Sequence, residues 1–168
     1  MEHLYSPWRS QFIDQASGMD SVDSPFARAW RQPERDVENL LLYRGTCAFI
    51  ILNRSPYNAG HLLVCPVREV PDLVDLSQEE RSELFELITL GMRVLRDALN
   101  PHGFNIGMNL GREAGAGIPS HVHAHVVPRW NGDTNFMPVM DEVRIISHAM
   151  DDVYSRLMRS LHRMLETQ

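Results

Sequence analysis

Three histidines alternate with small apolar residues in the segment His-Val-His-Ala-His at 121–125. Alternate residues of a β-strand point to the same side, so a strand here places His121, His123 and His125 on one face, with neighbours roughly 6.6 Å apart. A neutral imidazole is a nucleophile, and its usual pKa of about 6.5 leaves most of it neutral at pH 7. Flanking imidazoles can donate hydrogen bonds or protons to phosphate oxygens. We therefore expect chemistry at phosphorus, with one histidine attacking and its neighbours binding the phosphate.

Metal binding is the alternative for the same histidines, since His-x-His pairs on sheets also bind metals. Such a site needs further ligands. The nearby carboxylates of Glu113 and Asp133 lie in glycine-rich segments without an evident ligand spacing. The nucleophile interpretation is therefore preferred, and the metal-enzyme interpretation stays open.

The basic residues restrict how phosphate can be bound. All 16 are arginine, and the sequence contains no lysine. P-loop lysines, Schiff-base lysines and pyridoxal-phosphate anchors are therefore excluded. Phosphate must be met by arginine, histidine, hydroxyls, amides or backbone N–H groups. The formal net charge of −6 argues against a nucleic-acid-binding surface, which would be basic.

The two cysteines, Cys47 and Cys65, lie within apolar runs and are interpreted as buried thiols of a reducing compartment rather than as a disulfide. No apolar run approaches the length that spans a bilayer, and the first residues lack the apolar stretch of a signal peptide. We therefore expect a cytoplasmic protein with no membrane partner.

Apolar runs and turn residues predict an α+β domain with a mainly antiparallel sheet. A capping-box sequence beginning at Ser77 predicts the start of one long helix. The predicted elements are strands at 40–43, 47–52 and 61–66, a helix from 77 to about 99, strands at 104–110 and 121–128, and a helix from about 147 to 165. Residues 1–36 are expected to form an irregular N-terminal arm packed on a single domain of residues 37–168.

The segment His121–Pro128 has the alternating pattern of the histidine-triad (HIT) superfamily of nucleotide hydrolases and transferases, which this sequence resembles. Segments 52–66, 102–117 and 121–139, together with the N-terminal MEHLYSPWRSQFI, resemble the bacterial diadenosine tetraphosphate (Ap4A) phosphorylase group. The resemblance implies a HIT-like fold with a five-stranded sheet, one long central helix and a C-terminal helix. It also implies a homodimer in which the sheet extends across both protomers.

The resemblance also assigns roles to the histidines. His123 attacks the α-phosphorus and forms a nucleotidyl-histidine intermediate, His121 supports the site, and His125 contacts the α-phosphate and assists the leaving group. Glycines let backbone N–H groups approach phosphate, which agrees with this assignment. The implied nucleotide-binding residues are Asn53 at the ribose, Asn109, Gly115 and Gly117 at the phosphates, and Ser120 as a hydroxyl donor or a strand-edge hydroxyl.

The activity that the resemblance implies is phosphorolysis of Ap4A to ADP and ATP, with inorganic phosphate as the second substrate. Water could replace phosphate as the acceptor, which would make the protein a hydrolase of Ap4A, Ap3A or a nucleoside phosphoramidate. A nucleotide-binding module with vestigial catalysis is a third alternative. The residues do not separate phosphate from water.

A structural zinc found in many bacterial relatives is predicted to be absent. Those relatives carry Cys-x-x-Cys near residue 25 and two histidines. Here Ser24 and Ala27 stand at the cysteine positions, Glu69 replaces one histidine, and only His121 remains. Serine and alanine supply no thiolate. No cofactor is expected, packing by Phe26 and Trp30 would replace the metal, and the sequence leaves open whether a divalent ion accompanies the polyphosphate.

Three residues near the triad keep two interpretations each. His61, at a commonly occupied family position, is structural or functional. Arg129 neutralises distal phosphates or forms a surface ion pair. Trp130 stacks on a base or closes the dimer interface.

Overall fold

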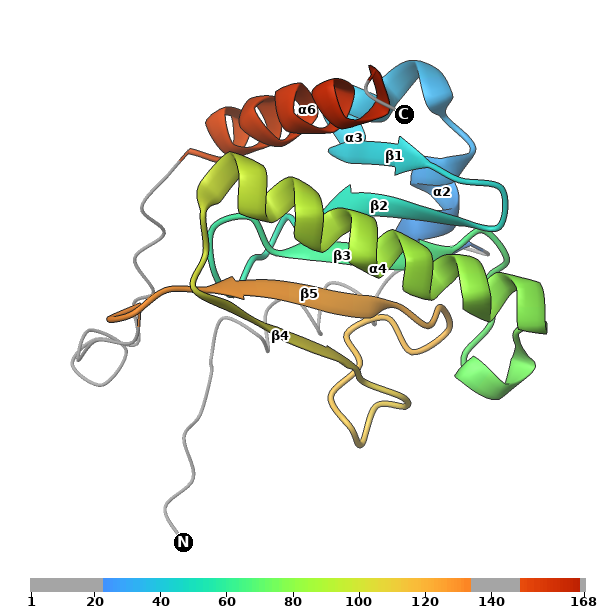
Figure 1. The fold of residues 1–168 in the computed structure, drawn as a ribbon. Helices are drawn as coiled ribbons and strands as arrows, with labels where there is room; N and C mark the ends of the chain where they lie inside the picture. The colour runs from blue at the N-terminus through green and yellow to red at the C-terminus, as the bar shows by residue number, and fades with distance from the viewer. Residues whose placement is uncertain (1–22, 134–148, 167–168) are drawn as a thin grey trace, which may run out of the picture.

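The computed structural model describes residues 23–133 and 149–166. The strands are β1 (Leu41–Arg44), β2 (Ala48–Leu52), β3 (Leu62–Pro66), β4 (Gly103–Met108) and β5 (Ala124–Arg129). The helices are α2 (Pro25–Trp30), α3 (Asp36–Asn39), α4 (Gln78–Leu99) and α6 (Met150–Glu166), with short 3-10 helices at Pro33–Arg35 and Leu73–Asp75 (Figure 1).

The strands form one five-stranded antiparallel sheet in the order β1-β2-β3-β5-β4. This confirms the α+β architecture predicted from the sequence, including the long helix and the C-terminal helix. Ser77 caps α4 through its side chain, and Glu80 reaches back to the Ser77 backbone, so the predicted capping box is present. The predicted start of the last helix near residue 147 falls outside the described residues.

The triad segment enters the sheet later than the sequence predicts. A strand was expected from residue 121, but β5 begins at Ala124, so only His125 of the three histidines lies on it. Proline explains the difference. The Val67 N–H donates to the Cys47 carbonyl, on the side of β2. Successive backbone groups of a strand point to opposite sides, so the backbone nitrogen of Pro66 faces β5. Proline has no N–H there, and the ladder of hydrogen bonds between β3 and β5 stops. The chain before Ala124 pairs instead through Val122, whose N–H bonds the Val70 carbonyl.

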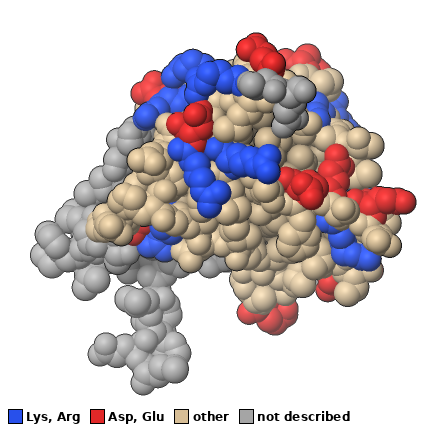
Figure 2. Space-filling view, in the orientation of Figure 1, with Lys and Arg blue, Asp and Glu red and all other residues tan. Residues whose placement is uncertain are grey.

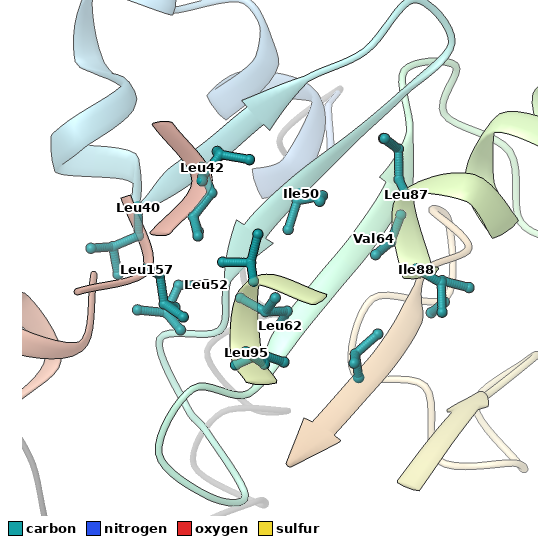
Figure 3. Close-up of a cluster of buried hydrophobic side chains, with 14 of the residues drawn as sticks. Leu40, Leu42, Ile50, Leu52, Leu62, Val64, Leu87, Ile88, Leu95 and Leu157 are labelled. Carbon is teal, nitrogen blue, oxygen red and sulfur yellow. The ribbon is translucent and has the colours of Figure 1, made fainter. Parts of the chain in front are cut away.

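The main hydrophobic core lies between the sheet and the two long helices, α4 and α6. Leu84, Leu87, Ile88 and Leu95 form the buried stripe of α4 that the three- and four-residue spacing predicts. Figure 3 shows this stripe meeting side chains of β2 and β3. The sheet residues in this core include Leu42, Ile50, Leu52, Leu62, Val64, Ala124 and Val126.

A second, smaller cluster covers the opposite face of β1, β2 and β3, where α2 packs (Figure 1). Phe26 and Ala29 of α2 are buried against the sheet, and Trp30 stacks on Phe49 with ring centroids 5.2 Å apart. The described part of the arm is thus helical where the sequence was expected to be irregular, and it packs on the domain. The division into an arm of residues 1–36 and a domain of residues 37–168 stays a prediction.

The register of the sheet decides which side chains share the α2 face. Leu63 of β3 belongs to the α2 cluster and pairs with His125, which pairs in turn with Gly107 of β4. Residues opposite one another in a sheet point to the same side. The α2 face therefore continues from the apolar cluster onto His125 and Gly107, and this is where the candidate site lies.

Three observations on the described residues concern membrane spans, the two cysteines and the surface arginines. No helix within residues 23–133 and 149–166 is long and apolar enough to cross a bilayer. Cys65 is buried and Cys47 is half-buried, and both are free thiols. Figure 2 shows arginines next to acidic side chains on the face covered by α4 and α6, and the Arg163–Asp97 ion pair joins these two helices.

Candidate active site

His123 is held with one ring nitrogen available as a nucleophile. Its Nδ1–H donates to the carbonyl of His121 at 2.8 Å, which leaves the lone pair of a neutral ring on Nε2. The side chain is 5% exposed. Burial lowers the pKa of His123, partly opposed by the hydrogen bond to the carbonyl, so the neutral ring is favoured. An uncharged, oriented imidazole of this kind suits attack on phosphorus.

His125 is joined to His61, and the pair is oriented by the turn that precedes β3. The Tyr57 N–H donates to Nδ1 of His61 at 3.0 Å, so the other nitrogen of a neutral His61 carries the proton. That Nε2 lies 2.9 Å from Nδ1 of His125. His61 therefore donates to His125, and the proton of His125 sits on its own Nε2. This arrangement makes His125 a proton donor, and it favours the functional interpretation of His61, which is fully buried.

His121 is fully buried, and both of its ring nitrogens have protein partners. Its Nε2–H donates to the Pro66 carbonyl at 2.8 Å, and its Nδ1 lies 2.6 Å from Oγ of Ser24. Burial lowers the pKa of His121, and the carboxylate of Glu69 opposes this. Because both nitrogens of this ring are bonded to protein groups, His121 has no ring nitrogen left for attack on phosphorus, and its supporting role stays a prediction.

Ring contacts bring the site together around His123. Its ring centroid is 5.0 Å from that of His125 and 5.0 Å from that of Phe26. Phe26 also meets His121 edge to face at 5.6 Å. Tyr57 stacks on His125 at 5.8 Å. His123 and His125 thus lie side by side between the rings of Phe26 and Tyr57.

The predicted nucleotide-binding residues lie in two loops near the histidines. Asn53 bonds Nδ1 of His61 at 3.2 Å and caps the following turn through Ser55. Asn109 donates to the carbonyl of Gly115 at 3.4 Å. Gly115 has φ of 88°, a conformation that favours glycine, and Gly117 follows in the same loop. The hydroxyl of Ser120 donates to the Glu69 carboxylate at 2.9 Å, and the same carboxylate accepts from the Ser24 N–H.

Arg129 forms the ion pair that was one of its two interpretations. It makes two hydrogen bonds to Asp133, at 2.6 and 2.8 Å, and the guanidinium holds the pKa of that carboxyl well below its usual range. Asn58 also donates to Asp133, at 2.8 Å. These contacts tie the end of β5 to the turn that carries Tyr57. The backbone N–H of Trp130 donates to the Asp133 carboxylate at 3.1 Å, and the role of the Trp130 ring stays a prediction.

Several residues of the site were not identified from the sequence: Ser24 as a partner of His121, Phe26 against two histidines, Tyr57, and Asn58 with Asp133. Tyr57 and Asn58 lie in a turn rich in polar and turn-forming residues, which signals a loop but not its contacts. The only local signal near Ser24 is the Ser-Pro pair, which is typical of a helix start. Their partners are distant in sequence and become visible only in the folded chain.

The residues at the predicted zinc positions do not fit a zinc site. The Ser24 hydroxyl is occupied by Ala27 and His121, and both nitrogens of His121 are bonded to protein. The Glu69 carboxylate accepts from the Ser24 N–H and the Ser120 hydroxyl. In the described part of the chain, no three His, Cys, Asp or Glu residues are grouped so as to hold a metal ion. The absence of zinc stays a prediction.

Comparison with known proteins identifies the family of this chain. The HIT domain family profile matches residues 34–132. The AP-4-A phosphorylase of Mycobacterium tuberculosis (strain H37Rv) is 36% identical over 172 residues, covering 100% of this chain and 84% of that protein. The asymmetrical bis(5'-nucleosyl)-tetraphosphatase of Schizosaccharomyces pombe is 35% identical over 97 residues, covering 58% of this chain and 53% of that protein.

A solved structure shares the fold. The Zn-bound histidine triad family protein from Mycobacterium smegmatis has a TM-score of 0.64 at 24% identity, covering 94% of this chain and 96% of that one. The chain belongs to the HIT domain family.

Proposed function

We propose that this protein is a nucleotidyltransferase that cleaves Ap4A by phosphorolysis to ADP and ATP. One observation carries the proposal: the Nδ1–H of His123 is bonded to a backbone carbonyl, and the resulting nucleophilic ring lies 5.0 Å from that of His125, a proton donor. The 36% identity to an AP-4-A phosphorylase over the whole chain supports this substrate class.

The first step transfers a nucleotidyl group to the enzyme. Nε2 of His123 attacks the α-phosphorus of Ap4A, a P–N bond forms, and the bond to the bridging oxygen of the leaving ATP breaks. His125 gives the proton on its Nε2 to that oxygen, and the hydrogen bond from His61 supports His125 as the proton leaves. The products of this step are AMP-histidine and ATP.

The second step transfers the nucleotidyl group to inorganic phosphate. A phosphate oxygen attacks the same phosphorus, the P–N bond to His123 breaks, and ADP is released. His125, now lacking its Nε2 proton, accepts one from the incoming phosphate and returns to its starting state. The sum is one Ap4A and one phosphate converted to one ATP and one ADP.

The nucleotide is proposed to bind on the part of the α2 face that lies beyond the apolar cluster, around His125 of β5 and Gly107 of β4. Asn105, Gly107 and Asn109 alternate along and just beyond β4 on the side of His125. A Cβ added at Gly107 would meet no heavy atom of residues 23–133 and 149–166 within 4 Å, so this part of the structure leaves room next to the histidine. Because Arg129 is engaged by Asp133, histidines and backbone N–H groups of the loop with Gly115 and Gly117 are proposed to meet the phosphates.

The test incubates the purified protein with Ap4A in the presence and absence of inorganic phosphate and separates the nucleotides. ADP and ATP formed only with phosphate support the proposal. AMP and ATP formed equally without phosphate would identify a hydrolase, and nucleotide binding without turnover would identify the vestigial module. His123→Ala is expected to abolish turnover, and parallel reactions with Mg²⁺ or a chelator show whether a divalent ion is needed.

We also propose a homodimer formed through β4, the last strand of the sheet. Ile106 of β4 is 46% exposed, and an edge strand with an exposed apolar residue is suited to pairing with a second copy. Light scattering is expected to give twice the chain mass, and Ile106→Lys is expected to give a monomer. Val74→Lys, at an exposed residue away from the sheet, is the matched control and is expected to leave the dimer intact.

The free thiols of Cys47 and Cys65 support the further proposal that the protein works in the cytoplasm. Fractionation of the cells that produce it, followed by thiol labelling, tests this. Recovery from an extracellular fraction with both thiols oxidised would contradict it.

A further inference from the structure

The hydroxyl of Ser24 lies at the junction of helix α2 and the triad. Ser24 is the N-cap of α2, and its Oγ accepts from the Ala27 N–H at 3.0 Å. The same Oγ lies 2.6 Å from Nδ1 of His121, 97 residues away in the sequence. The Ser24 N–H donates to the carboxylate of Glu69, with distances of 2.9 and 3.2 Å to its two oxygens.

The directions of these hydrogen bonds are fixed by what each group can donate. The Pro66 carbonyl only accepts, so Nε2 of His121 carries a proton. In the neutral ring Nδ1 then accepts, and the single hydroxyl proton of Ser24 must point to it. The Ala27 N–H occupies the acceptor side of the hydroxyl. The Glu69 carboxylate holds the Ser24 backbone and so fixes where the hydroxyl sits.

The backbone of His121 carries this restraint to His123. A ring held at both nitrogens leaves residue 121 little freedom, and its carbonyl accepts the Nδ1–H of His123 at 2.8 Å. Phe26 follows Ser24 by two residues and packs on both imidazoles. The start of α2 thus reaches His123 in two ways. Phe26 packs on its ring, and Ser24 holds His121, whose carbonyl accepts the Nδ1–H of His123.

We propose that Ser24, anchored by Glu69, is a positioning residue for the nucleophile: its hydroxyl holds His121 in the Nε2–H form and thereby keeps the His121 carbonyl on Nδ1 of His123. The catalytic consequence rests on the proposed nucleotidyl transfer. The tautomers and the hydrogen bonds do not depend on it. At these positions a hydrogen-bonded serine and carboxylate stand where relatives are expected to use metal ligands.

The chain offers a matched control for the simpler role of Ser24 as a helix cap. Ser77 is the N-cap of α4 and accepts from the Glu80 N–H at 3.2 Å, and no histidine of the described residues bonds its side chain. Ser77→Ala and Ser24→Ala each remove one cap hydroxyl, which typically costs about 1 kcal/mol of stability. Only Ser24→Ala removes a hydrogen bond to His121. Ser24→Thr keeps the hydroxyl at residue 24.

The first measurement is ¹⁵N NMR of the full chain labelled at histidine, which reports the protonated nitrogen of each ring. The wild type is expected to show a neutral Nε2–H form for His121 and a neutral Nδ1–H form for His123. Ser24→Ala is expected to lose these fixed forms for both rings, whereas Ser24→Thr and Ser77→Ala keep them. Unchanged spectra of Ser24→Ala would overturn the proposal.

The second measurement is the single-turnover rate at which Ap4A forms nucleotidyl-enzyme without phosphate. Ser24→Ala is expected to slow this step about 10- to 100-fold at saturating Ap4A, as loss of positioning does, with little change in Ap4A affinity. Ser24→Thr is expected to restore most of the rate, and Ser77→Ala to lower the Tm alone. Equal slowing in Ser77→Ala, or no recovery in Ser24→Thr, would overturn the proposal.

The two measurements separate this inference from the proposed function. If the wild type forms no nucleotidyl-enzyme, the proposed reaction fails, and the NMR result still decides whether Ser24 sets the two tautomers. If Ser24→Ala does not fold, Glu69→Ala removes the anchor of the same hydroxyl and is measured in its place. Wild-type spectra and rate in Glu69→Ala would then overturn the proposal.

Discussion

Nε2 of His61 lies 2.9 Å from Nδ1 of His125, and the proton between these rings belongs to His61 because the Tyr57 N–H occupies its other nitrogen. A residue that never needs to touch the substrate thus decides which nitrogen of His125 can donate a proton. The same logic applies on the other side of the site, where Ser24 and Pro66 decide the form of His121.

Replacing His61 with alanine is expected to lower kcat on Ap4A by about 10- to 100-fold, because general acid help from His125 is weakened. The KM is expected to change little. An AMP ester of p-nitrophenol needs no protonation of its leaving group and is the control substrate. Steady-state rates on both substrates check the prediction, and equal losses on the two would show that His61 only maintains the fold.

The pH dependence of kcat/KM is expected to reflect the buried nucleophile. Burial lowers the pKa of His123, so its neutral form persists to a lower pH than that of an exposed histidine. Activity requires the neutral form, and it is therefore lost only as the pH falls through this lowered pKa. We expect the acid limb to lie below about 6.5. An acid limb above that value would contradict the neutral, buried state of His123.

Filling the space beside His125 is expected to block the substrate. Gly107→Val adds a side chain suited to a strand, at a position where a Cβ meets no atom of the described chain within 4 Å, so folding is expected to be preserved. The KM for Ap4A should rise by at least about tenfold. Gly103→Val, at the start of β4 and equally unobstructed, is the control and should leave the KM unchanged.

Stability should depend on pH through Glu80. Hydrogen bonds from Arg68 and from the Ser77 backbone lower the pKa of this carboxyl to about 2. Because the folded pKa lies below the unfolded one, its contribution is present above about pH 4.5 and is lost as the pH falls toward 2. Glu80→Gln is expected to lower the Tm at pH 7, with a difference from the wild type that shrinks between pH 5 and 2. A constant difference across this range would rule out ionisation of Glu80 as the cause.

Metal analysis tests the predicted absence of a structural zinc. The purified protein is expected to hold far less than one zinc per chain, and a chelator should leave its Tm unchanged. The reason is that Ser24 and Ala27 offer no thiolate and that both nitrogens of His121 are already bonded. One tightly held zinc per chain, with a fall in Tm on its removal, would show that the site rearranges around a metal.

The predictable features were those set by local patterns. The capping box at Ser77 and the apolar stripe through Leu84 and Leu95 identify α4, because a helix repeats every 3.6 residues regardless of what it packs on. The late start of β5 could not be read from the alternating histidines, since it depends on Pro66 in a neighbouring strand. A proline interrupts the hydrogen bonds between two strands only where its nitrogen is directed at the neighbouring strand. The sequence does not show to which side of the strand that nitrogen points.

The sequence by itself determined which groups are available for chemistry: three histidines at 121, 123 and 125 spaced to share one strand face, arginine without lysine, and a resemblance to the HIT superfamily. The tertiary structure alone decided the protonation of each ring. His61 meets His125 across 64 residues and Ser24 meets His121 across 97. Which nitrogen of an imidazole carries the proton depends on its partners, and here the decisive partners come from distant segments that only folding brings together.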